Sequence, residues 1–113
     1  MAPSLVHGEW GGEHLGLVVT TARADVEFDC ATGWITLPIA TDRTGRFEVA
    51  GVYSPGHGGP IREGEEMPEH PAVYSGVVRG ELMSLTVAVP ALSATLGPYA
   101  LRRGAPAGVF KCL

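Results

Sequence analysis

Hydrophobic and polar residues alternate with a period of two along most of the chain. The segment ADVEFDC (24–30) places its apolar side chains on one face and its three acidic side chains on the other. The same alternation recurs in HLGLVVTT (14–21) and RFEVAGVY (46–53). No window keeps a 3.6-residue period between two caps, so we expect half-buried strands with one solvated face.

The C-terminal half continues this pattern. Residues 74–89 predict two strands that join near Arg79–Gly80, residues 94–103 predict a strand interrupted at Gly97–Pro98, and VFKCL (109–113) predicts a short last strand. Residues 90–96 allow one helical turn at most. Turn residues separate the runs, at 21–23, 32–33, 41–45, 79–80 and 103–108.

Many short strands with hairpin-scale connections predict an all-β fold. We expect a small antiparallel up-and-down β-barrel of about seven to eight strands, because closure removes the edges that a small apolar sheet would expose. A β-sandwich is the alternative. The length of 113 residues, with 45% hydrophobic and 18% charged residues, predicts a single domain over 1–113 with its own core.

One segment breaks the alternation. Residues 54–71, SPGHGGPIREGEEMPEHP, are too long and too polar for a hairpin turn. Connections of this length without secondary structure are uncommon, and they often serve a function. We therefore expect this loop to be a binding loop or lid.

The N-terminal stretch GEWGGEH (8–14) allows two arrangements. If Trp10 lies on the inner face of one continuous strand, His14 shares its parity and points into the barrel. If a bulge at Gly11–Gly12 swaps the parity, Leu15, Leu17 and Val19 lie inside with Trp10, and His14 lies on the surface.

Gly8-Glu9-Trp10 resembles the Gly-x-Trp that opens the first strand of calycins, the superfamily of lipocalin, fatty-acid-binding and avidin-like barrels. The resemblance implies an up-and-down barrel in which a basic residue on the last long strand, here Arg102 or Arg103, packs over that tryptophan. The order of segments from GEWGGEH to FKCL also resembles a group of small bacterial domains, and that resemblance brings no established activity.

The two cysteines, Cys30 and Cys112, bear on whether the protein is cytoplasmic or exported. A disulfide between Cys30 and Cys112 would stabilise the chain by about 4 kcal/mol in the chain-entropy model and would hold the C-terminal tail. Such a bond favours an extracytoplasmic protein, whereas two buried thiols favour the cytoplasm. The segment MAPSLVHG has neither a basic n-region nor an apolar h-region, so an exported chain would have lost a leader.

Charge and motifs narrow the function classes. The net charge of −4 and the scattered basic residues argue against nucleic-acid binding, and no run is apolar enough to span a bilayer. We expect neither a cofactor nor a metal site, because the histidines lack ligand spacing on one element. The residues that could otherwise act as ligands are His14, His57 and His70 with Glu13, Glu65, Glu66 and Glu69.

The function predicted from these features is a small binding or interaction module that meets a small molecule or a protein at the open end of the barrel. One alternative is a small cyclase or isomerase with His14 or His57 as general base. Another is a structural protein that forms a homodimer by pairing strands such as LTVAV (85–89). The candidate ligand-binding residues are Trp10, His14, Trp34, Tyr53, His57, Tyr74 and Arg102.

Overall fold

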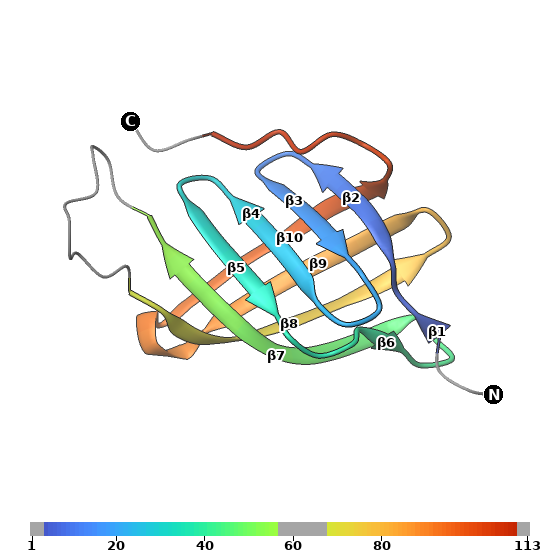
Figure 1. Ribbon diagram of the computed structural model, residues 1–113, viewed down its shortest axis with the longest axis horizontal. Coiled ribbons are helices and arrows are strands. Elements are labelled where there is room, and N and C mark those ends of the chain that lie inside the picture. The colour runs from blue at the N-terminus through green and yellow to red at the C-terminus, as the bar shows by residue number, and fades with distance from the viewer. Residues whose placement is uncertain (1–3, 57–67, 111–113) are drawn as a thin grey trace.

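The computed structural model describes residues 4–56 and 68–110 and shows a closed antiparallel β-barrel (Figure 1). Eight strands close the barrel in the order β10-β2-β3-β4-β5-β7-β8-β9, and β1 pairs with β6 outside it. The strands are β1 (Ser4–Leu5), β2 (Gly8–Gly12), β3 (Leu15–Val19), β4 (Ala24–Phe28), β5 (Ala31–Ile35), β6 (Ala40–Thr41), β7 (Arg46–Pro55), β8 (His70–Arg79), β9 (Leu82–Val89) and β10 (Ala94–Arg103). A single 3-10 turn, η1 (Pro90–Leu92), joins β9 to β10.

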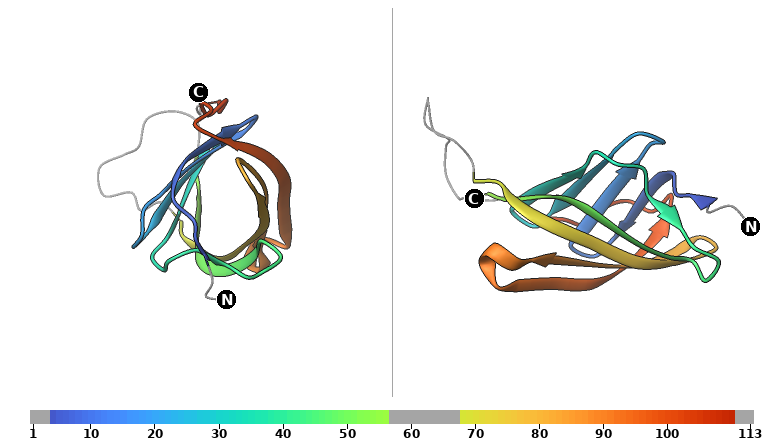
Figure 2. Two further views of the ribbon diagram at one scale, coloured as in Figure 1. Left: turned by 90° about the vertical axis from the view of Figure 1, so that its right-hand side faces the viewer. Right: turned by 90° about the horizontal axis from the view of Figure 1, so that it is seen from below.

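The prediction of an up-and-down barrel is therefore confirmed, and the alternative β-sandwich is wrong. Each barrel strand pairs with its neighbours in the chain, and β10 closes the ring on β2 through Arg102↔Gly11 and Arg103↔Trp10. The view along the barrel shows this ring directly (Figure 2).

Because successive strands run in opposite directions, the connections alternate between the two ends of the barrel. We call the end with the β2–β3, β4–β5, β7–β8 and β9–β10 connections the loop end, and the other the opposite end.

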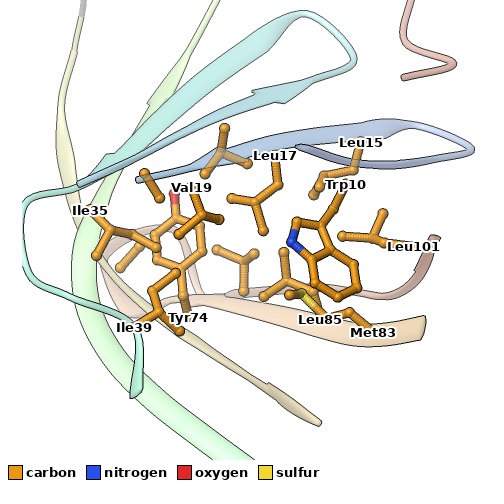
Figure 3. Packing of buried hydrophobic residues seen from close by; sticks show 14 of the residues in the cluster. Trp10, Leu15, Leu17, Val19, Ile35, Ile39, Tyr74, Met83, Leu85 and Leu101 are labelled. Carbon is orange, nitrogen blue, oxygen red and sulfur yellow. The ribbon is translucent and has the colours of Figure 1, made fainter. Parts of the chain in front are cut away.

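The barrel interior is occupied by one cluster of apolar side chains, drawn in part in Figure 3. It follows the period-two alternation, since β4 buries Ala24, Val26 and Phe28 and exposes Asp25 and Glu27. An eight-stranded barrel is just wide enough for side chains to fill it. The largest fully buried side chains are Trp10, Tyr74, Leu15, Leu17, Ile35, Ile39, Leu85, Val87 and Val89.

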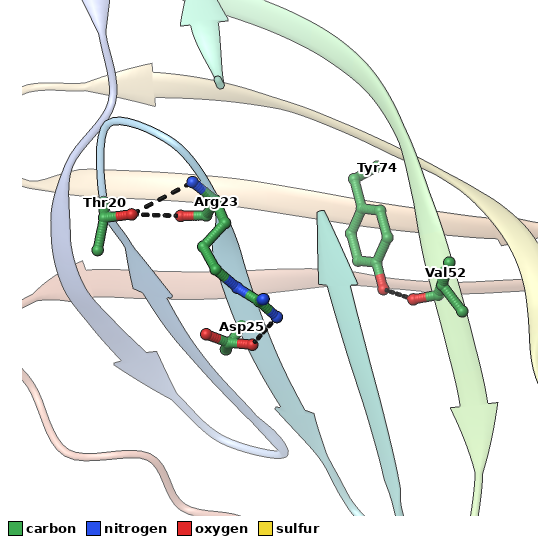
Figure 4. Close-up of polar contacts among 5 residues, drawn as sticks. All are labelled: Thr20, Arg23, Asp25, Val52 and Tyr74. Carbon is green, nitrogen blue, oxygen red and sulfur yellow. Dashed lines mark hydrogen bonds and ion pairs between the residues drawn. The ribbon is translucent and has the colours of Figure 1, made fainter. Parts of the chain in front are cut away.

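Tyr74 crosses the interior between two glycines on neighbouring strands. A Cβ atom on Gly33 would collide with the Tyr74 hydroxyl, and one on Gly51 would lie 2.8 Å from the Tyr74 ring. The hydroxyl donates a hydrogen bond of 2.6 Å to the carbonyl of Val52 (Figure 4). The glycines thus give the ring space, and the Val52 carbonyl gives its buried hydroxyl a partner.

The structure corrects the arrangement of the N-terminal stretch. β2 and β3 form a hairpin whose last pair is Gly12↔Leu15, so Glu13 and His14 are a two-residue turn. Neither a continuous strand nor a bulge at Gly11–Gly12 is present. The hairpin itself reverses the parity, which buries Leu15 and Leu17 beside Trp10 and leaves the His14 side chain 52% exposed.

The turn predicted at 32–33 is also wrong. Thr32 and Gly33 lie inside β5, and the chain turns at Asp29–Cys30, with Cys30 left-handed at a φ of 54°. Tyr74 occupies the space that a side chain at position 33 would need. Gly33 is therefore explained by packing inside a strand, although glycine is typical of turns. The predicted last strand also fails for Val109 and Phe110, which lie outside the strands, and 111–113 lie outside the described residues.

Burial of the ring, with a smaller contribution from Tyr53, raises the pKa of Tyr74 above the ordinary value of 10.0. In the unfolded chain the Tyr74 phenol loses its proton near the ordinary pKa, whereas in the folded chain it stays protonated to a higher pH. The free energy of unfolding should therefore fall as the pH rises above about 10. In urea unfolding, Tyr74→Phe should cost about 1 kcal/mol at neutral pH and flatten the alkaline fall. An equally steep alkaline fall in the variant and the wild type would contradict this assignment.

Candidate functional site

Trp10 closes the interior towards the opposite end of the barrel and is covered by a basic residue from β10. The Arg103 guanidinium carbon lies 4.7 Å from the centroid of the Trp10 ring. The Arg103 Nε lies 3.3 Å from a Glu81 carboxylate oxygen, while the Trp10 indole N–H donates to the His7 carbonyl. Arg102 pairs with Gly11 and is exposed on the outer face. Arg103 is therefore the residue that packs over Trp10.

The other aromatic candidates divide between the two faces of the barrel wall. Trp34 pairs with the exposed Asp25, so it lies half-buried on the outer face and does not line the interior. Tyr53 lies on the inner face near the loop end, with its ring centroid 5.1 Å from that of Phe28. Burial raises the pKa of the Tyr53 phenol, as it does for Tyr99, whose ring centroid lies 6.3 Å from that of Phe28.

His14 lies at the loop end beside two residues that the sequence reasoning did not select. Its Nδ1 lies 2.5 Å from a carboxylate oxygen of Asp29, and its ring centroid lies 5.8 Å from that of Phe110. The Phe110 residue is 68% exposed, the largest value among the large apolar residues described. A polar pair and an exposed aromatic ring therefore stand side by side on the surface.

A C-terminal segment, residues 104–110, holds these groups in place, and we call it the strap. It leaves β10 at the opposite end and runs back along β2 and β3 to the loop end (Figure 1). Backbone hydrogen bonds join it to β2, through Gly104 N to Glu9 O and Gly108 N to Gly12 O. Two more join it to the β2–β3 and β4–β5 turns, from His14 N to Gly108 O and from Cys30 N to Phe110 O. The Phe110 amide also donates to the second oxygen of Asp29 at 2.7 Å.

The backbone conformation of the turns differs between the two ends. In the described part of the chain, the non-glycine residues with positive φ are His14, Cys30 and Ser93, and each lies in a turn at the loop end. At the opposite end the positive-φ residues are glycines: Gly8, Gly45, Gly80 and Gly104. A left-handed conformation costs a residue with a side chain about 1–2 kcal/mol, so the loop end keeps side chains where glycine would be less strained.

Several predicted residues are not brought together. His57 and Cys112 lie outside the described residues, so their predicted roles stay predictions. His70 begins β8 opposite Tyr53. Within 4–56 and 68–110, no group of three or more His, Cys, Asp or Glu side chains could hold a metal ion. In the same ranges, no helix is long and apolar enough to cross a membrane.

Asp29 and Phe110 were absent from the candidate residues predicted from sequence, whereas Arg103 was named with Arg102 as the residue that packs over Trp10. Arg103 could have been chosen over Arg102 from the pairing of β10 with β2, because the residue opposite Trp10 shares its face. Phe110 and Asp29 are 81 residues apart in the chain, and no local pattern links them.

Comparison with protein-family models, curated proteins and solved structures gives no significant match to this chain. The eight-stranded barrel therefore stands on the structure itself, and a relationship to calycins stays a prediction.

Arg103→Ala should lower the free energy of unfolding by about 1–2 kcal/mol, because it removes a cation–π contact and the side-chain stem that covers Trp10. Arg102→Ala changes the charge equally on the exposed face and should stay within about 0.5 kcal/mol of the wild type. Denaturant titration followed by Trp fluorescence compares the two. Equal losses in both variants would contradict the assignment of Arg103.

The hydrogen bond between Cys30 N and Phe110 O places the β4–β5 turn against backbone that lies two residues before Cys112. Non-reducing peptide mapping should therefore yield a linked Cys30–Cys112 peptide. Reduction should lower the stability by about 4 kcal/mol in the wild type. The Cys30→Ser/Cys112→Ser variant is the control, and its stability should not respond to reductant. Alkylation of both cysteines in protein denatured without reductant would disprove the bond.

Proposed function

We propose that the protein is a binding module that meets a protein partner at the loop end of the barrel. The observation that carries this proposal is the set of three strained turn residues there, His14, Cys30 and Ser93. Strain of this kind persists where the surrounding structure fixes it, and it clusters at functional sites. The glycine turns of the opposite end show that the same fold can turn without it.

The geometry of the loop end suits a protein surface better than an enclosed small molecule. The interior is occupied by core side chains such as Trp10 and Tyr74, so a partner is met from outside. Phe110 offers an exposed aromatic anchor, and the Asp29 carboxylate and His14 ring offer polar groups beside it. Aromatic anchors within a polar surround are typical of binding hot spots.

The strap makes this surface preorganised. Asp29 accepts from the Phe110 amide with one oxygen and contacts His14 with the other, and His14 N donates to Gly108 O. Groups that are already fixed lose little conformational entropy when they bind, which favours affinity.

The two alternatives have weaker support. A cavity enzyme with His14 as general base conflicts with the position of His14 on an exposed turn, outside the interior. Pairing of LTVAV (85–89) with a second copy conflicts with the position of β9, which is hydrogen-bonded to β8 on one side and to β10 on the other.

A calycin relationship is a further part of the proposal. It is supported by Gly8-Glu9-Trp10 at the start of the first barrel strand, by the meander of eight strands, and by Arg103 over the Trp10 ring. The motif carries the resemblance, and the meander and the position of Arg103 are the two features that the resemblance implies.

Site-specific photo-crosslinking tests the proposed site. p-Benzoylphenylalanine placed at position 110 should give discrete protein adducts in an extract of cells that produce this protein. The same group at position 82 is the control, because Leu82 is also exposed, at 52%, but lies at the opposite end. The His14→Gly variant keeps the left-handed turn without the ring, and it should reduce the adduct yield while stability changes by about 1 kcal/mol or less. Equal yields from both positions, or no adduct from position 110, would overturn the proposal.

A further inference from the structure

A groove lies on the outer face of the barrel, on the flank formed by β3 and β4. One wall is the strap at Ala105, Pro106 and Ala107, and the floor is the outer face of the sheet. The strap lies close to the sheet because Gly11 and Gly16, a cross-strand pair, have no side chains there. A Cβ atom on Gly16 would lie 2.5 Å from the Ala107 Cβ, and one on Gly11 would collide with the Ala105 carbonyl.

The register of the strands determines which side chains meet in this groove. Glu9 pairs with Val18, and Val18 pairs with Asp25, so one row across the sheet carries an apolar side chain between two carboxylates. In the next row, Glu27 stands between Gly16 and Thr32. Directly paired side chains on one face lie about 4.5–5.5 Å apart at their Cβ atoms, so these groups form one surface.

The floor of the groove combines an exposed apolar residue with uncompensated negative charge. Val18 is 45% exposed. Of the three carboxylates, Asp25 pairs with Arg23 at 2.7 Å (Figure 4). Glu9 and Glu27 have no ion pair within the described ranges 4–56 and 68–110, and the lining residues include no Lys, Arg or His.

We infer that this groove binds an extended segment of a partner protein that carries a lysine or arginine next to an apolar side chain. The apolar residue would cover Val18 and the alanines of the strap, and the cation would lie between Glu9 and Glu27. Charge complementarity of this kind selects a partner and speeds its association. The strap itself lies along the outer face of this sheet, against Gly11 and Gly16, so a chain segment can lie along this face. This inference is independent of the loop-end site.

Titration of the 15N-labelled full chain with the peptide Ac-Val-Lys-Val-Lys-Val-NH2 tests the inference. Amide shift changes should be confined to the groove, at residues 16–18, 25–27, 32, 105 and 107. The peptide Ac-Val-Glu-Val-Glu-Val-NH2 should cause none, and free lysine should bind far more weakly, because it lacks the apolar neighbours.

Matched variants distinguish the groove from general attraction. Glu9→Gln and Glu27→Gln should each weaken binding by up to about fivefold, the range for exposed ion pairs. Val18→Ser should weaken it through the loss of apolar contact. Glu48→Gln is the control, because it removes the same charge from an exposed position on β7 outside the groove.

Three results would overturn the inference. The first is an equal loss of affinity in Glu48→Gln and Glu27→Gln, which indicates non-specific electrostatics. The second is shift changes located at the loop end or scattered over the barrel. The third is groove shifts that depend on protein concentration without peptide, which assigns the surface to a second copy of the chain.

Discussion

The narrowness of the eight-stranded barrel is the constraint on which the rest of the structure depends. In this protein one cluster of apolar side chains fills the interior, so the Tyr74 ring requires a place where the neighbouring strands have no side chain. Gly33 and Gly51 provide that place for Tyr74. On the outer face, Gly11 and Gly16 leave the space that the strap occupies against the barrel wall. Four glycines that look like turn residues thus lie inside strands because something else occupies their side-chain space.

This filled interior determines where recognition can occur. The residues that follow the inner parity, among them Trp10 and Tyr74, belong to one buried cluster. Chemistry that can reach a partner is therefore on the turns and on the outer face. The two ends differ in this respect, since the described arginines all lie towards the opposite end: Arg23, Arg43, Arg46, Arg79, Arg102 and Arg103. The turns of the opposite end also carry the acidic residues Asp42 and Glu81, whereas the described turns of the loop end carry Glu13 and Asp29.

The period of two was sufficient to predict the strands and the barrel, because each strand must place its apolar side chains on one face. It placed Ala24, Val26 and Phe28 inside correctly, and it marked the interruption at Gly97–Pro98, where the register of β10 shifts. The preference of glycine for turns gave a wrong prediction at Gly33, because packing against the distant Tyr74 requires a glycine inside β5. The site was less predictable than the fold, because the Asp29–Phe110 contact depends on the path of a segment without strand periodicity.

The strap connects the two proposed surfaces physically. The same seven residues hold the Asp29–His14 pair at the loop end and form a wall of the groove on the flank. Its hydrogen bonds to Glu9, Gly12, His14 and Cys30 attach it along its whole length, so displacement at one end would strain the contacts at the other. Because these hydrogen bonds already fix the strap before any partner binds, neither surface requires the strap to move in order to bind, and each can act without the other.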